Sequence, residues 1–168
     1  MNHKGWAFRL KQGVQLLLVV ALVSALADWW RSPKVPADAA QMRLPESAQT
    51  LAQASQNDTV VLYFWATWCG ICRHTSPALE KLHQDGVKVV GIALQSGSDA
   101  EVQRYLRDHN WHFATLNDSH GEWSRRWKIR ATPTIVFVRG GKVRHSTSGM
   151  ASYWGLKARW AAVSLMSK

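Results

Sequence analysis

The run WATWCGICR at residues 65–73 constrains this chain more than any other feature. It contains the only two cysteines of the sequence, Cys69 and Cys72, and it directly follows the apolar run VVLYF at residues 60–64. A short apolar run before a turn indicates a buried strand, and the residues that follow favour a helix. Since the chain has no other cysteine, the two thiols must pair with each other, bind a metal together, or react with another molecule.

The spacing of the two cysteines suits thiol–disulfide exchange. At the start of a helix, unpaired backbone N–H groups and the helix dipole favour an anion, so a thiol there ionises more readily. Only the thiolate attacks a disulfide. Cys69 occupies this place, Arg73 adds positive charge nearby, and Cys72 follows three residues later on the same helix face. We therefore assign Cys69 as the attacking nucleophile and Cys72 as the resolving thiol.

A CxxC motif can also be half of a structural zinc site, which usually needs four cysteine or histidine ligands. His74 and His83 fall on the predicted helix, but the sequence has no second CxxC and no H-x₃₋₅-H pair. This context favours redox exchange, so we expect no metal site. The sequence also lacks flavin, nicotinamide and phosphate-binding motifs, and we therefore expect no dissociable cofactor.

The composition of the chain restricts its partners. With 168 residues, 46% of them apolar, the chain can form one domain plus a tail. Its formal net charge is +10, but the basic residues are spread along the sequence. Nucleic-acid binding would require a longer basic stripe or a base-reading motif, and neither is present. We expect no nucleic-acid partner.

The N-terminal region indicates an export signal. A basic end precedes an uncharged stretch rich in leucine and valine, and Trp29-Trp30-Arg31 follows it. Residues 12–30 are just long enough to cross a bilayer, which takes about 17–25 residues. We favour an uncleaved single-pass anchor in the inner membrane, with its basic end in the cytoplasm and the remaining chain in the periplasm. Cleavage after Ala25-Leu26-Ala27, which has small residues at its first and third positions, is the alternative.

Three regions follow from this interpretation: an anchor at residues 1–31, a tether at residues 32–42 and a folded domain at residues 43–168. In the folded domain, strands alternate with helices and a hairpin comes near the end, which predicts an α/β sandwich with a central mixed sheet flanked by helices. The expected helices span residues 45–56, 69–84, 99–109, 121–127 and 151–166, and the expected strands span residues 59–65, 87–94, 113–116, 134–138 and 143–147.

Taken together, these features resemble the thioredoxin superfamily and, within it, the membrane-anchored TlpA/ResA-like branch. The resemblance is greatest to the suppressor-of-copper-sensitivity D group, whose members are protein disulfide oxidoreductases. The match is carried by the run at 65–73, Pro77 in the active helix, Ala131-Thr132-Pro133-Thr134 before the hairpin, Gly149 after it and the inserted strand–helix segment at 87–116. The resemblance therefore implies a thioredoxin-like fold.

It also implies further site residues. The Thr132–Pro133 bond would be cis and face the two cysteines, leaving the backbone of Thr132 free to pair with an extended substrate peptide. Trp68 would shield the thiolate, and Gly149 would line the substrate groove.

Two positions depart from the family pattern. Thioredoxin has a buried acidic residue six positions before its first cysteine, where this chain has Tyr63. Many TlpA-like proteins have a glutamate three positions after the second cysteine, where this chain has Thr75. The usual proton acceptor for Cys72 is therefore missing at both places.

The resemblance implies a membrane-tethered thiol–disulfide oxidoreductase that acts on protein thiols and disulfides. It would work as a reductase recharged by a membrane electron donor, such as a transmembrane thiol reductase. Oxidation uses the same residues, and the reduction potential decides the direction, since a tenfold shift in equilibrium is only about 30 mV. A role in copper tolerance rests on the resemblance alone. The alternative is a module that captures Cu(I) with both thiolates and has no redox turnover.

Overall fold

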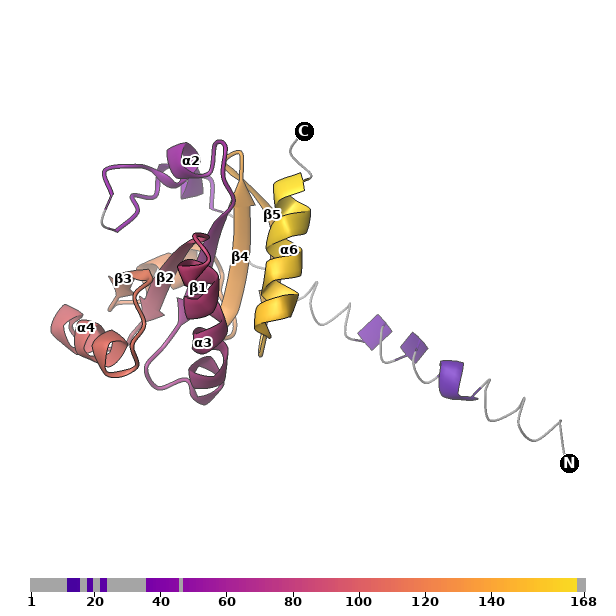
Figure 1. Cartoon of the computed structure of the whole chain (residues 1–168). Coiled ribbons are helices and arrows are strands. Elements are labelled where there is room, and N and C mark those ends of the chain that lie inside the picture. The colour runs from indigo at the N-terminus through magenta and orange to yellow at the C-terminus, as the bar shows by residue number, and fades with distance from the viewer. Residues whose placement is uncertain (1–11, 16–17, 20–21, 24–35, 46, 166–168) are drawn as a thin grey trace, which may run out of the picture. The chain divides into compact units, whose positions relative to one another are not determined.

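The computed structural model describes residues 12–15, 18–19, 22–23, 36–45 and 47–165 (Figure 1). The chain divides into two compact units, Met1–Ser32 and Pro33–Lys168. The described residues of the first unit are helical, and most of the anchor expected at residues 12–30 lies outside the described part. Within the described ranges, no helix combines the length and the apolar character that a membrane crossing requires.

A five-stranded mixed sheet forms the centre of the second unit, with the strand order β3-β2-β1-β4-β5 (Figure 1). The first three strands run parallel to one another, while β4 is antiparallel to both β1 and β5. The bounds are β1 Val60–Trp65, β2 Lys88–Leu94, β3 Ala114–Asp118, β4 Thr134–Arg139 and β5 Lys142–Ser148. The predicted mixed sheet is confirmed.

The middle strand, β1, is buried along its whole length. Every residue from Val60 to Trp65 has an exposure of 0%. Because successive side chains of a strand point to opposite faces, β1 supplies both apolar cores. One core receives Val61, Tyr63 and Trp65, and the other receives Val60, Leu62 and Phe64.

Helices cover both faces of this sheet. The first core takes side chains from α3 (Gly70–Gln84), α4 (Asp99–Asp108) and α6 (Tyr153–Leu165). The second core takes side chains from η1 (Ala39–Gln41), from α2 (Leu51–Ala54), and from Trp123 and Trp127 in and after α5 (Glu122–Arg126). Both connections between parallel strands, through α3 and through α4, therefore pack on the same face.

The segment before β1 differs from the prediction. The sequence predicts a helix over residues 45–56, whereas the structure has the four-residue helix α2. An antiparallel bridge joins Arg43 to Thr50 and closes the loop between them. The Thr50 hydroxyl accepts the N–H of Gln53, and the Gln53 side chain accepts the N–H of Thr50. This capping box begins the helix at Leu51.

The expected tether over residues 32–42 overlaps the folded domain. Ala39–Gln41 form the 3₁₀ helix η1. Ala39 and Met42 are 4% and 1% exposed and belong to the second core. The packed domain therefore begins at or before Ala39, ahead of the predicted boundary at residue 43.

The remaining predicted elements are present, with their ends shifted by a few residues. The active helix begins at Gly70 and continues through Pro77 to Gln84. Ser98 caps α4 through a capping box with Glu101. Local sequence signals are enough to locate these elements, because residues at their ends mark where they start or stop.

Gly91 on β2 has no room for a side chain. A Cβ there would lie 2.6 Å from Oγ1 of Thr115, 2.8 Å from Nε1 of Trp65 and 3.1 Å from a ring carbon of Phe113. We expect Gly91→Ala to lower the free energy of unfolding by about 1–3 kcal/mol, as overpacked cores do, measured by urea denaturation of the oxidised protein.

Gly70→Ala is the matched control, since a Cβ at that position meets nothing within 4 Å. We expect it to change the same free energy by less than about 0.5 kcal/mol. Equal stability of the two variants would show that the sheet opens around residue 91 without cost.

Candidate active site

The two cysteines lie where β1 ends and α3 begins. Cys69 is the N-cap of α3, and its Sγ accepts the backbone N–H of Cys72 at 3.2 Å. The two residues form a disulfide, with their Cα atoms 5.2 Å apart. Cys69 is 6% exposed and Cys72 is 1% exposed. The helix start thus presents the Cys72 N–H to Cys69, the more exposed of the two residues.

The loop before β4 lies against Cys69. The Thr132–Pro133 bond is cis, and the Thr132 carbonyl oxygen lies 3.5 Å from Sγ of Cys69. Gly149 donates its N–H to the Pro133 carbonyl at 2.9 Å. Its φ of +89° belongs to the left-handed region that glycine adopts without a Cβ penalty. The structure thus places Thr132 against Cys69, and Gly149 against the next residue of that loop, Pro133.

Trp68 is held by the loop that follows β2. Its indole N–H donates to the Gln95 carbonyl at 3.1 Å, although the side chain is 61% exposed. Gln95 adopts a left-handed φ of +42°, and its N–H donates to the Asp118 carbonyl at 3.0 Å. The Asp118 carboxylate in turn accepts the N–H groups of Trp123 and Ser124. A chain of hydrogen bonds therefore connects α5 to the tryptophan beside Cys69.

A second contact from the same loop fixes the residue before Trp68. The N–H of Thr67 donates to the hydroxyl of Ser96 at 3.0 Å, and Ser96 donates to the Leu94 carbonyl at 3.0 Å. Sequence reasoning missed Gln95 and Ser96. The available signal was that β1 and β2, as parallel neighbours, end at the same edge of the sheet, so the loops after them meet.

Exposed apolar side chains accompany the site residues along the chain. Trp68 precedes Cys69, Ile71 precedes Cys72 and Met150 follows Gly149. Ile71 is 51% exposed and Met150 is 75% exposed. Such side chains beside a reactive disulfide are suited to contact with another polypeptide.

Two neutral hydroxyl groups occupy the positions where related proteins have acids. The Tyr63 hydroxyl lies 2.8 Å from Oγ of Ser76 and 3.4 Å from the Cys72 carbonyl oxygen. Burial raises the pKa of Tyr63 well above its usual value, and the hydrogen bond to Ser76 offsets this only in part. Thr75 donates its hydroxyl to the Ile71 carbonyl at 3.2 Å. Neither side chain can serve as a proton acceptor at neutral pH.

The buried carboxylate of α3 lies away from the cysteines. Glu80 accepts the backbone N–H of His112 at 2.7 Å, the His112 ring at 2.9 Å and the Gln84 amide at 2.9 Å. It follows Cys72 by eight residues, which corresponds to about 12 Å along a helix. Glu80 therefore ties α3 to the segment before β3 and is not positioned to accept a proton from Cys72.

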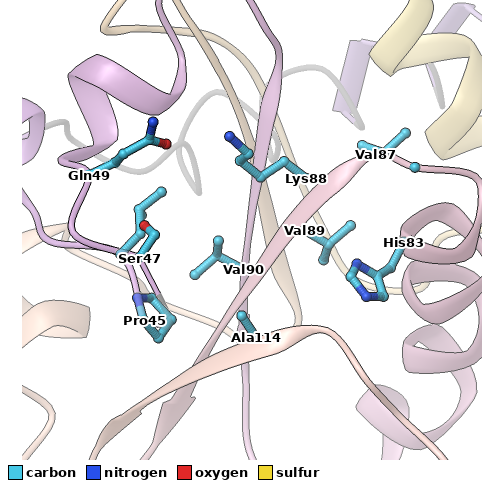
Figure 2. Close-up of a pocket in the computed structure, with 11 residues that line it drawn as sticks. Pro45, Ser47, Gln49, His83, Val87, Lys88, Val89, Val90 and Ala114 are labelled. Carbon is cyan, nitrogen blue, oxygen red and sulfur yellow. The ribbon is translucent and has the colours of Figure 1, made fainter.

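No three histidine, cysteine, aspartate or glutamate side chains gather as a metal site would require in the part of the chain that the structure describes. A pocket of about 300 Å³ does exist, with His83 in its wall (Figure 2). Pro45 and Gln49 line its other side, next to Lys88 at the start of β2. Lys88 pairs with Val60, the first residue of β1, whereas the cysteines follow the last one. The pocket and the disulfide thus lie at opposite ends of the sheet.

Comparison with known proteins adds sequence and structural relatives. Residues 35–146 match the family described as AhpC/TSA. A thioredoxin-like protein of Haemophilus influenzae is 43% identical over 153 residues, covering 89% of this chain and 92% of that protein. The thiol-disulfide oxidoreductase ResA of Oceanobacillus iheyensis is 25% identical over 157 residues, covering 84% and 81%.

One solved structure among the matches is a secreted disulfide oxidoreductase of Mycobacterium tuberculosis, described as homologous to DsbE of E. coli. It superposes with a TM-score of 0.57 at 29% identity, and the match covers 65% of this chain and 84% of that one.

The hydrogen bonds of Glu80 make stability depend on pH. Burial raises the pKa of this carboxyl, but the bonds from His112 and Gln84 outweigh burial and hold the pKa below its usual value. Because the folded-state pKa is the lower one, Glu80 stabilises the fold above about pH 4.3, and this contribution is lost as the pH falls through the folded-state pKa. We expect Glu80→Gln to lower Tm at pH 7, with a gap to the wild type that narrows as the pH falls below about 4.3 and closes once the pH is below the lowered folded-state pKa.

Circular dichroism melts of the oxidised protein in steps from pH 7 to pH 3 would measure this gap. Glu122→Gln, at an exposed carboxylate in the first turn of α5, is the control and should have the smaller effect throughout. A Glu80→Gln gap that does not change with pH would contradict the assignment to the carboxylate.

Proposed function

The chain belongs to the AhpC/TSA family of thioredoxin-like proteins and is a thiol–disulfide oxidoreductase; on this premise we propose that it reduces disulfides of partner proteins outside the cytoplasm while tethered to the membrane. One observation carries the proposal. The Cys69–Cys72 disulfide lies at the N-terminus of α3, and the Cys72 N–H contacts Sγ of Cys69. In the reduced protein this N–H and the helix dipole favour the thiolate of Cys69.

The exchange proceeds in two steps. The Cys69 thiolate attacks one sulfur of the partner disulfide, forming a mixed disulfide, and the other partner sulfur leaves as a thiolate that takes a proton from solvent. Cys72 then loses its proton to solvent and attacks Sγ of Cys69, which releases the second partner sulfur as a thiolate. Two electrons pass from the dithiol to the partner, and the Cys69–Cys72 disulfide of this structure is the product.

The surroundings of Cys69 support an extended polypeptide as the substrate. The backbone of Thr132 lies against the sulfur, and an extended peptide can pair with an exposed backbone segment of this kind. Gly149 keeps the neighbouring backbone free of a side chain. The exposed Trp68, Ile71 and Met150 add apolar contact area. We assign Trp68, Thr132, Pro133 and Gly149 to substrate binding.

The membrane part of the proposal rests on the sequence. Residues 12–30 are apolar enough and long enough for a single-pass anchor, which would place the folded domain in the periplasm. A dithiol spent in each turnover must be regenerated, and we propose a transmembrane thiol reductase as the electron donor. The resemblance to copper-sensitivity suppressors suggests a role in copper tolerance, through protection of cysteines from metal-driven oxidation.

Single cysteine variants test the two roles. We expect Cys69→Ser to abolish reduction of a disulfide-bonded protein such as insulin, since the one remaining thiol, Cys72, is only 1% exposed. Cys72→Ser should still react once and stop as a stable mixed disulfide, visible as a mass adduct on Cys69. The reverse pattern would exchange the two assignments.

The reduction potential tests the direction. Equilibration of the wild type with glutathione buffers should give a value well below about −200 mV for a reductase, whereas a value near about −120 mV would indicate an oxidase. A dithiol that never forms the Cys69–Cys72 disulfide, yet binds Cu(I) with a stoichiometry of one, would favour the Cu(I)-binding alternative.

Membrane attachment has its own test. In bacterial cells that express the full chain, we expect the protein to stay in the membrane pellet after a carbonate wash, because residues 12–30 remain in the bilayer. Leu18→Arg combined with Leu22→Arg should move it out of the pellet, since each charge is costly in a spanning segment. A soluble mature protein that begins just after Ala27 would support the cleaved signal instead.

A further inference from the structure

The Tyr63 hydroxyl is a buried polar contact between the middle strand and the active helix. Tyr63 belongs to β1 and is 0% exposed, while its contacts, Ser76 and Cys72, both lie on α3. Either oxygen can donate in the 2.8 Å bond between Tyr63 and Ser76. When Ser76 donates, the tyrosine proton is free to point at the Cys72 carbonyl, 3.4 Å away. Strand and helix are thus linked directly beneath the second cysteine.

We propose that Tyr63, anchored by Ser76, is a positioning residue that holds Cys72 in place for the resolving step. The proposal rests on the two-step exchange described above. It assigns to Tyr63 a geometric role at the position where thioredoxin carries an acid.

The backbone of α3 explains why such a link matters there. Pro77 lies inside the helix and has no N–H, so the carbonyl four residues earlier, that of Arg73, receives no helical hydrogen bond from it. The first turn, which carries Cys72, is therefore tied less tightly to the helix body than a regular turn. The Tyr63 hydroxyl from β1 reaches the carbonyl of the neighbouring residue, Cys72, and so adds a contact between this turn and the sheet.

The position of the tyrosine ring is itself fixed. Its ring is stacked on Trp65 with centroids 6.4 Å apart, and it meets Phe113 edge-on at 6.0 Å. Both partners are buried. Because the ring belongs to a strand that is packed on both faces, the hydroxyl offers α3 a fixed point of attachment.

The chemistry of the hydroxyl limits it to this role. Burial raises the pKa of Tyr63, so the phenol stays protonated at neutral pH and cannot act as a base. The proton of Cys72 therefore leaves to solvent, and the departing partner thiolate takes its proton from solvent. Once the Cys69–Cys72 bond is open, Tyr63 keeps the backbone of Cys72 where its sulfur can reach Cys69 again.

Rapid acid quenching and mass spectrometry can separate the two steps. The reduced full chain is mixed with oxidised glutathione, and the glutathione adduct on Cys69 is followed as it forms and decays. For Tyr63→Phe we expect adduct formation at the wild-type rate and adduct decay slowed roughly fivefold, which corresponds to about 1 kcal/mol, the contribution of one hydrogen bond. The adduct should therefore accumulate.

Tyr105→Phe is the matched control. It removes the same hydroxyl group from a tyrosine of α4 that packs on the same Trp65 ring, and adduct decay should stay at the wild-type rate. Ser76→Ala keeps the whole tyrosine and removes the hydroxyl that anchors it, so we expect decay of the glutathione adduct to be slowed roughly twofold. If Tyr63→Phe does not fold, Ser76→Ala tests the proposal instead.

The possible outcomes separate the two proposals. Wild-type decay rates in both Tyr63→Phe and Ser76→Ala would overturn the positioning role, even if both variants melted at lower temperature. Slowed decay in Tyr105→Phe would also overturn it, because the effect would then belong to the aromatic cluster as a whole. Failure of the wild type to form any adduct on Cys69 would instead contradict the exchange mechanism.

Discussion

Burial of β1 on both faces determines where the cysteines emerge from the fold. A strand with polar residues on both sides could shift along its neighbours, but every side chain of β1 is enclosed. A slip of one residue would send Tyr63 and Trp65 into the core that now holds Leu62 and Phe64. The register with β2 and β4 is therefore tightly specified. The chain leaves the sheet at one defined point, and Cys69 follows four residues later.

Around that point, the loops are held by neutral groups. Backbone carbonyls of Gln95 and Thr132 and the hydroxyl of Ser96 contact the residues from Thr67 to Cys69. The ionised Glu80 is used two turns along α3, to hold the helix against the rest of the domain. The helix N-terminus, with the Cys72 N–H at Sγ of Cys69, favours negative charge on that sulfur. The Tyr63 phenol, which contacts the Cys72 carbonyl and the Ser76 hydroxyl, supplies no base for Cys72.

Local patterns predicted most of this fold. Three such patterns each involve only a few neighbouring residues and can therefore be recognised in the sequence. They are the apolar run before the cysteines, the capping residues of α4 and the glycine pair of the final hairpin. The prediction of a helix over residues 45–56 was wrong, because a closed loop followed by a short helix also places the apolar residues of this segment in the second core. The Thr50–Gln53 capping box marks the true start of the helix and could have been recognised in the sequence. The Gln95 and Tyr63 contacts join segments 27 and 13 residues apart, which no local pattern encodes.

The burial of Ala39 limits how far the cysteines could travel from a membrane. Under the proposed anchorage, the spanning segment ends at residue 30, and Ala39 already belongs to the packed domain. Eight residues lie between them. At about 3.3–3.6 Å per residue when fully extended, this linker is less than about 30 Å long. Under that anchorage, so short a connection would keep the folded domain near the bilayer surface. Partners that are themselves fixed at the membrane would meet Cys69 often, while proteins diffusing through the wider compartment would seldom do so.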